Sequence, residues 1–436
     1  MAPEEIIELL KERNELYNHY ITIVERRKSG GTRGHGAPTG NNTDAEPSRA
    51  TASLRNEPIA VKDLVFTKGI RTTGGSRAFE NFIPEYNASI VDAIEENGGV
   101  IVGKTNLHEF GAGSTSTSKA FGTVSNPHDP QLIAGGSSGG SAATVAAAEV
   151  NMAIGTDTGG SVRIPAAFCG IVGFKPTLGR ISRFGIFPLA WSMDTVGILG
   201  SSVEYVMRLY NVLRFYDPRD PPTVANLSKG DNPSKRVRRI GIVKEQSRGV
   251  EVEHEFNEFV NKISTSYDVE EVSIPELAML AQVRFIQIRA EMAAYHEPIF
   301  ESNKEKYGED VLASILQGFN VKAIDYINAQ RLRELLSSAV IKKFKEYDIL
   351  ISPTVPVPPP KISDVEGKEQ NWRTILNANT SPYNMVCLPA ISIPYSKFVG
   401  IQVVANLWED RSLLAFSKEL QQFIQYRPAI APTVGE

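Results

Sequence analysis

The chain has 436 residues, a formal net charge of −4, a hydrophobic fraction of 42% and a charged fraction of 22%. These values fit a folded protein with a large buried core and exclude a chain that is disordered throughout. The slightly acidic balance gives no electrostatic reason to expect direct binding of nucleic acid. No stretch of about 20 apolar residues is present, so no membrane span is expected.

Cys169 and Cys387 are the only cysteines. Two cysteines exclude a disulfide framework and a cysteine-rich zinc site. The first residues are typical of an amphipathic charged helix and differ from a secretory signal. We therefore expect a cytoplasmic protein, and no metal or other cofactor.

In chain order, the first predicted element is a surface helix from residue 3 to about residue 26, because apolar residues recur at helical spacing. Residues 28–52 are rich in Gly, Asn, Thr and Pro, which predicts a mobile surface loop. Residues 59–65 predict a buried strand that contains one lysine, Lys62. A helix near 88–97 and a strand at 100–103 follow.

Two clusters rich in glycine and serine come next, at residues 135–141 and 155–161. The alanine-rich stretch 142–148 between them predicts a helix, and residues 150–154 predict a buried strand. Each cluster therefore lies at the boundary of an element. Glycines there allow backbone N–H groups to converge on one point, which is how an oxyanion is stabilised in acyl transfer.

The second half follows a connection rich in Pro and Asp at residues 216–222. Its periodicity predicts helices near 252–264, 282–300 and 327–346, and strands at 349–351, 391–393 and 401–404. Alternation of helices and strands favours an α/β architecture. Periodicity alone leaves open whether this half is a separate domain or completes the sheet of the first half.

Several short motifs suggest other chemistry. Residues 135–139 match G-x-S-x-G, the nucleophile elbow of α/β-hydrolases, which requires a later histidine base. Only His254 and His296 lie downstream, both in charged helical segments. Ser116 and Lys119 match S-x-x-K without its partner motifs. No zinc helix or phosphate-binding loop is complete.

A stronger interpretation combines Lys62, Ser137 in the first glycine cluster and Ser161 at the end of the second. A serine hydroxyl needs a base before it becomes a good nucleophile, and a buried lysine can be that base when burial lowers its pKa. The alternatives are an edge-strand lysine with a solvated head, and serines that cap the helix starting near Gly139.

The sequence resembles the amidase signature family through residues 58–63, 102–106, 135–141 and 155–167, and again at 388–392. The resemblance covers most of the chain beyond residue 55. It implies an α/β fold with a large mixed β-sheet core flanked by α-helices on both faces. It also implies a single domain over residues 1–436, in which 55–210 form the signature core and 239–436 complete the sheet and the substrate pocket.

The resemblance further implies a Ser-Ser-Lys triad. Ser161 would attack the amide carbonyl, Ser137 would carry the proton through an unusual cis peptide, and Lys62 would be the terminal base. Ser138 would be a supporting hydroxyl. The N–H groups of the second glycine cluster would form the oxyanion hole, namely those of Thr158, Gly159, Gly160 and Ser161.

Three other residues near these clusters have expected structural roles. Asp157 and Arg163 are interpreted as an ion pair that shapes the loop around Ser161. Cys169 is interpreted as a small buried side chain and not as a nucleophile, because little nearby would depress its pKa.

Two functions share this machinery within the family. One is an amidase that hydrolyses the C–N bond of a small-molecule carboxamide. The alternative is the glutaminase component, or A subunit, of the tRNA-dependent Asp/Glu amidotransferase, which requires partner subunits. That component usually has a carboxylate where Asn377 stands here, and a neutral amide is a weaker partner for the α-ammonium of glutamine. The sequence therefore favours the hydrolase and leaves a homodimer open, while a catalytically dead scaffold is disfavoured because all three triad positions are filled.

Overall fold

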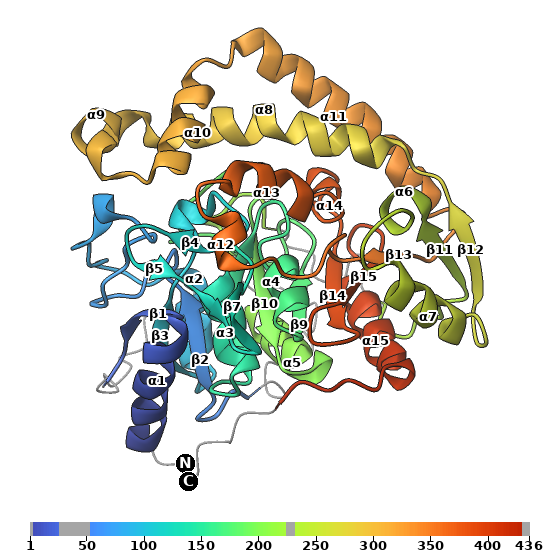
Figure 1. Ribbon diagram of the computed structural model, residues 1–436, viewed down its shortest axis with the longest axis horizontal. Helices are drawn as coiled ribbons and strands as arrows, with labels where there is room; N and C mark the ends of the chain where they lie inside the picture. The colour runs from blue at the N-terminus through green and yellow to red at the C-terminus, as the bar shows by residue number, and fades with distance from the viewer. Residues whose placement is uncertain (1–2, 26–52, 224–231, 430–436) are drawn as a thin grey trace, which may run out of the picture.

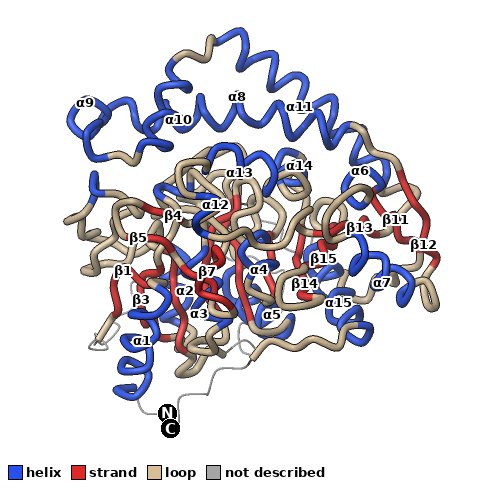
Figure 2. The backbone as a smooth tube through the Cα atoms, in the orientation of Figure 1, coloured by secondary structure: helices blue, strands red, loops and turns tan. Residues whose placement is uncertain are grey.

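The computed structural model describes residues 3–25, 53–223 and 232–429. An eleven-stranded mixed β-sheet runs through the molecule, with helices around it (Figures 1 and 2). In sheet order its strands are β1 (Tyr20–Ile23), β3 (Val100–Thr105), β2 (Pro58–Lys62), β8 (Met152–Asp157), β10 (Thr195–Gly200), β9 (Val172–Lys175), β14 (Ala390–Pro394), β15 (Gly400–Val404), β13 (Ile349–Pro353), β11 (Arg239–Val243) and β12 (Asp268–Val272).

The α-helices in chain order are α1 (Pro3–Tyr17), α2 (Ser89–Glu96), α3 (Gly139–Ala146), α4 (Arg163–Phe168), α5 (Val203–Leu213), α6 (Lys244–Ser247), α7 (Glu253–Ile263), α8 (Glu276–His296), α9 (Phe300–Asn303), α10 (Glu309–Phe319), α11 (Ala323–Lys343), α12 (Ile362–Val365), α13 (Glu369–Leu376), α14 (Ser381–Met385) and α15 (Asp410–Leu420). Four short strands form two hairpins outside the main sheet: β4 (Thr117–Ser118) with β5 (Gly122–Thr123), and β6 (Ser125–Asn126) with β7 (Asp129–Ile133).

Successive residues of the central strands belong to different hydrophobic cores. Ile59 and Val61 of β2 belong to a core that includes residues of α2, α5, α7 and α15, whereas Ala60 belongs to a second core with residues of α1, α3 and α4. This is the two-residue period of a sheet that is buried on both faces. Helices therefore lie on both faces, and the predicted α/β layer architecture is confirmed.

Strands from both halves of the chain form this one sheet. β14 pairs antiparallel with β9, and β13 pairs with β15 and β11. The long helices α8 and α11 pack against each other in a third core, and α8 extends above α13 and α14 (Figure 1). The second half thus continues the sheet of the first half and adds a helical layer near it.

The helix expected from residue 3 to about 26 is shorter than predicted. It ends at Tyr17, because Asn18 adopts a left-handed φ of 53° and residues 20–23 form β1 against β3. The loop expected at residues 28–52 lies outside the described residues. Among the helices that the structure describes, none has the length and hydrophobicity to span a membrane.

Candidate active site

The candidate site forms where β2 and β8 end. The two strands are parallel and in register, with Ile59 opposite Met152 and Val61 opposite Ile154. Their carboxyl ends therefore lie at the same edge of the sheet. Lys62 is the last residue of β2 and Asp157 the last residue of β8, so the sheet brings their side chains to one region.

Lys62 is completely buried and contacts Ser137 directly. Its Nζ donates hydrogen bonds to Ser137 Oγ at 2.7 Å and to Thr156 Oγ1 at 2.9 Å. Burial lowers the pKa of Lys62 to about 7, although the carboxylates of Asp157 and Asp194 act to raise it. The alternative of an edge-strand lysine with a solvated head is therefore wrong. A substantial fraction of this amine is neutral at neutral pH.

The first glycine cluster is a loop held from several sides. The peptide bond between Gly136 and Ser137 is cis, as the resemblance implied. The Ser137 carbonyl accepts hydrogen bonds from the His108 N–H at 3.1 Å and from Ser116 Oγ at 3.3 Å. These contacts position the Ser137 hydroxyl beside Lys62.

Ser138 occupies the N-cap position of α3, yet its side chain makes no capping hydrogen bond. Its hydroxyl donates to the Thr156 carbonyl at 3.2 Å instead, and Ser116 Oγ accepts the Gly139 N–H at 3.2 Å. The interpretation of Ser138 as a capping side chain is therefore wrong. Its hydroxyl connects the first cluster to β8, which agrees with a supporting position.

Ser161 lines a pocket that lies close to Ser137 and Lys62, because Gly111 of the same lining is near both side chains. Its carbonyl accepts the Ser138 N–H at 3.1 Å, which ties the two glycine clusters together. Ser161, Thr158 and Gly159 line the pocket together with Gly111–Ser114 and side chains of α8 and α13. The structure thus brings Ser137 and Lys62 into contact and places Ser161 next to them with access to a cavity.

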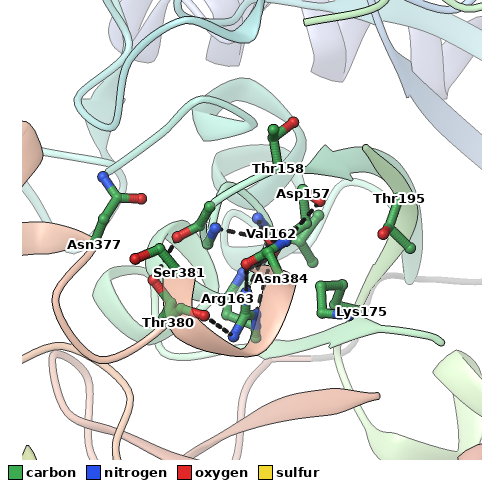
Figure 3. Close-up of polar contacts among 12 residues, drawn as sticks. Asp157, Thr158, Val162, Arg163, Lys175, Thr195, Asn377, Thr380, Ser381 and Asn384 are labelled. Atoms are coloured by element: carbon green, nitrogen blue, oxygen red, sulfur yellow. Dashed lines mark hydrogen bonds and ion pairs between the residues drawn. The ribbon is translucent and has the colours of Figure 1, made fainter. Parts of the chain in front are cut away.

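Asp157 and Arg163 form the expected ion pair, and both are fully buried (Figure 3). Arg163 also donates to the Thr380 carbonyl at 3.0 Å, Gln402 Oε1 at 2.7 Å and Asn384 Oδ1 at 2.6 Å. Burial alone would raise the pKa of Asp157, but the charge and hydrogen bonds of Arg163 lower it to about 2. The Asp157 carboxylate is therefore charged at neutral pH, and the pair anchors the second cluster to the C-terminal part of the chain.

The four residues expected to form the oxyanion hole have different surroundings in the structure. The Gly160 N–H donates to Asp157 Oδ1 at 2.8 Å, so in this structure it is directed at the carboxylate and not at the pocket. Thr158 and Gly159 line the pocket, and the Thr158 hydroxyl donates to Asp194 Oδ1 at 2.6 Å. Of the four residues expected to supply backbone donors, Thr158, Gly159 and Ser161 line the pocket, whereas the Gly160 N–H is bonded to Asp157.

Gly160 has a role that requires the absence of a side chain. Its φ is +133°, and a Cβ placed there would lie 2.1 Å from Thr380 Oγ1. The Thr380 hydroxyl donates to the neighbouring Gly159 carbonyl at 2.7 Å. This close approach of Thr380 therefore depends on glycine at position 160.

Several residues of the site were not predicted from the sequence. Thr156 contacts Lys62, Asp194 holds Thr158, and Asn384 donates to Asp157 Oδ1 at 2.8 Å. Thr156 stands inside the second glycine cluster and could have been found there. Asp194 lies beside Asp157 because Thr195 of β10 pairs with Asp157 of β8, and Asn384 belongs to α14, far away in the sequence. Neither contact leaves a local signal in the sequence.

Cys169 is buried, and its Sγ lies 3.4 Å from the Ala134 carbonyl. Burial raises the pKa of its thiol far above the usual value. It is the small buried residue expected. Across the described part of the chain, no group of three or more His, Cys, Asp or Glu side chains is arranged to hold a metal ion.

Comparison with known proteins places this geometry in a family. The family model described as Amidase matches residues 35–414. The chain is 36% identical to the A subunit of the glutamyl-tRNA(Gln) amidotransferase of Archaeoglobus fulgidus over 393 residues, which is 84% of this chain and 85% of that protein.

Two solved structures are similar over nearly the whole chain. The A subunit of the glutamyl-tRNA(Gln) amidotransferase of Thermotoga maritima has a TM-score of 0.80 at 29% identity, covering 99% of this chain and 93% of that one. A protein described as an amidase has a TM-score of 0.80 at 28% identity, covering 97% and 96%. Fold and relatives define an enzyme that acts on C–N bonds of amides. The chain belongs to the amidase signature family.

Proposed function

We propose that this protein hydrolyses a small carboxamide through an acyl-enzyme on Ser161. The observation that carries the proposal is the buried hydrogen bond from Lys62 Nζ to Ser137 Oγ at 2.7 Å, next to a serine that opens onto a pocket. A lysine whose pKa is lowered to about 7 supplies a neutral amine without requiring a histidine.

The proposed reaction begins when the Ser161 hydroxyl loses its proton to Ser137, whose own proton passes to Lys62. Ser161 Oγ then bonds to the carbonyl carbon, and the oxyanion is stabilised by backbone N–H groups of Thr158, Gly159 and Ser161. The C–N bond breaks as the proton returns through Ser137 to the leaving nitrogen, which departs as an amine or ammonia.

In the second half of the proposed reaction, water attacks the Ser161 ester. One proton of that water passes through Ser137 to Lys62, and the C–O bond to Ser161 breaks as a proton returns to Ser161 Oγ. The products are a carboxylic acid and free enzyme. No cofactor is needed in either half.

The alternative is the glutaminase component of an amidotransferase, and it is supported by the identity to the two amidotransferase relatives named above. The residue at position 377 argues against it. Asn377 lines the pocket, and the described residues of that lining include neither Asp nor Glu. An α-ammonium group of glutamine would therefore find no carboxylate there.

The test is an assay of the purified chain, without partners, on a panel of simple amides and on glutamine. We expect release of ammonia from at least one simple amide, faster than from glutamine. Activity on glutamine alone, or activity that appears only with added partner subunits, would favour the amidotransferase alternative. We also propose that the chain forms the single domain expected over residues 1–436, and the sheet to which both halves contribute supports this proposal.

A further inference from the structure

Three arginines line the pocket onto which Ser161 opens. Arg284 and Arg289 belong to α8, and Arg373 belongs to α13. The two helices lie far apart in the sequence, and Figure 1 shows α8 passing above α13. The pocket therefore concentrates positive charge from two separate elements beside the proposed nucleophile.

These guanidinium groups have N–H donors that the protein does not use. Arg284 is 3% exposed, and its Nη1 donates to the Ser381 hydroxyl and to the Asn377 carbonyl. Within the described chain, no hydrogen-bond partner exists for the buried atoms Arg284 Nη2, Arg289 Nε, and Arg373 Nε and Nη2. A buried donor left without an acceptor destabilises the folded protein. Of these four donors, only Arg373 Nη2 has an ion-pair partner among the described residues, and all four belong to arginines that line one cavity.

The positive charge is only partly neutralised by protein carboxylates. Asp310 Oδ2 lies 3.5 Å from Arg373 Nη2, but it is shared with His108 Nε2 at 2.8 Å. Arg284 and Arg289 form no ion pair with any carboxylate in the described ranges, and both stack on the Phe285 ring, with Cζ 4.4 and 5.3 Å from its centroid. Burial, with a smaller effect of Arg373, lowers the pKa of Arg284 to about 9, so it remains charged at neutral pH.

The rest of the lining is apolar and includes Leu189, Ile288 and Met292. A pocket with this composition favours a short hydrocarbon segment that ends in an anion, because a carboxylate accepts several guanidinium N–H bonds at once. We propose that the substrate is an amide that also carries a carboxylate, such as the monoamide of a short dicarboxylic acid. The carboxylate would bind Arg284, Arg289 and Arg373 while the amide carbonyl faces Ser161. This inference rests on the proposed amidase function for its reaction.

The test separates binding from chemistry. Calorimetry on the Ser161→Ala variant compares malonamate, succinamate and glutaramate with the neutral diamides of the same length. We expect at least one monoamide to bind about tenfold or more tightly than its diamide, the effect of one charge-assisted hydrogen bond. Glutaramate should also bind more tightly than glutamine, which differs by an α-ammonium group. Equal or weaker binding of the monoamide at every chain length would overturn the proposal.

Arginine variants test whether the tighter binding of the monoamide depends on this pocket. Arg289→Gln and Arg284→Gln should each reduce the affinity for the preferred monoamide about tenfold, the value of one charge-assisted hydrogen bond, while the affinity for the diamide changes little. Arg331→Gln is the matched control, because Arg331 is exposed on α11 and does not line this pocket. Arg284 also holds Ser381, so Arg289→Gln decides if Arg284→Gln does not fold. A preference unchanged in Arg289→Gln contradicts the assignment.

Turnover by the wild-type protein distinguishes failure of the two proposals. Hydrolysis of diamides and monoamides at equal rates, without a binding preference, would overturn the carboxylate proposal and keep the amidase function. A clear binding preference with no hydrolysis of any amide would overturn the amidase function and keep the carboxylate site.

Discussion

Arg163 and Asp157 face each other through two parallel hydrogen bonds, Nε to Oδ2 at 3.0 Å and Nη2 to Oδ1 at 2.9 Å. Removing one partner leaves a buried charge without compensation. Asp157→Asn should therefore lower the free energy of unfolding by about 3–5 kcal/mol, measured by urea denaturation. In the solvent-accessible pair of Arg248 with Glu253, Glu253→Gln is the control and should have a much smaller effect on the free energy of unfolding. Equal effects of the two substitutions would contradict the buried-pair argument.

The lowered pKa of Asp157 also predicts that the free energy of unfolding depends on pH. The pKa of Asp157 in the folded protein is about 2, below the value of about 3.9 for an unfolded aspartate. The unfolded state therefore binds the proton first, and the contribution of Asp157 is fully present above about pH 4 and lost as the pH falls towards about 2. The stability difference between wild type and Asp157→Asn should shrink over that range. A difference that stays constant throughout it would show that the folded pKa is not depressed.

Gly160→Ala tests the close approach of Thr380. The added methyl group would lie 2.1 Å from Thr380 Oγ1 at a φ of +133°, so the loop around Ser161 must shift. We expect amide hydrolysis to fall about a hundredfold or more, because a displaced oxyanion donor has effects of that size. Gly69→Ala is the control, since Gly69 has a φ of +76° and a methyl group there would meet no described atom within 4 Å. It should keep full activity.

The α/β layers of the fold and the residues Lys62, Ser137 and Ser161 could be identified from the sequence, because both depend on local patterns. The buried strand around Lys62 and the paired glycine clusters are such patterns. The end of α1 could not be predicted, because periodicity does not distinguish a continued helix from Tyr20–Ile23, which becomes a strand only by pairing with β3. The arginine pocket left no local signal either, because Arg284 and Arg373 meet only when α8 packs over α13.

Ser161→Ala should abolish amide hydrolysis, with a loss of about a thousandfold or more, because the proposed nucleophilic oxygen is removed. Circular dichroism and the unfolding temperature should stay close to those of the wild type, since only one hydroxyl is lost. Ser138→Ala is a neighbouring comparison that should retain more activity, as Ser138 is proposed only to support the loop. Near-normal turnover by Ser161→Ala would refute the proposed mechanism.

Lys62→Met should be inactive near neutral pH, because among the described residues no other basic side chain bonds to the Ser137 hydroxyl. In the wild type, kcat/KM should rise with pH through the pKa of about 7 and level off above it. The sign follows from the role: the base must be neutral, and the amine loses its proton as the pH rises. A profile that is flat across this pKa, or one that falls as the pH rises through it, would contradict Lys62 as the base.

The hydrogen bonds that hold the second glycine cluster come from residues that lie much later in the chain. Thr380, Asn384 and Gln402 contact Gly159, Asp157 and Arg163, and β14 pairs with β9 only after residue 390 exists. During synthesis on a ribosome, the serine loop is therefore made long before its supports emerge. A growing chain would have no organised nucleophile until Gln402 has left the exit tunnel.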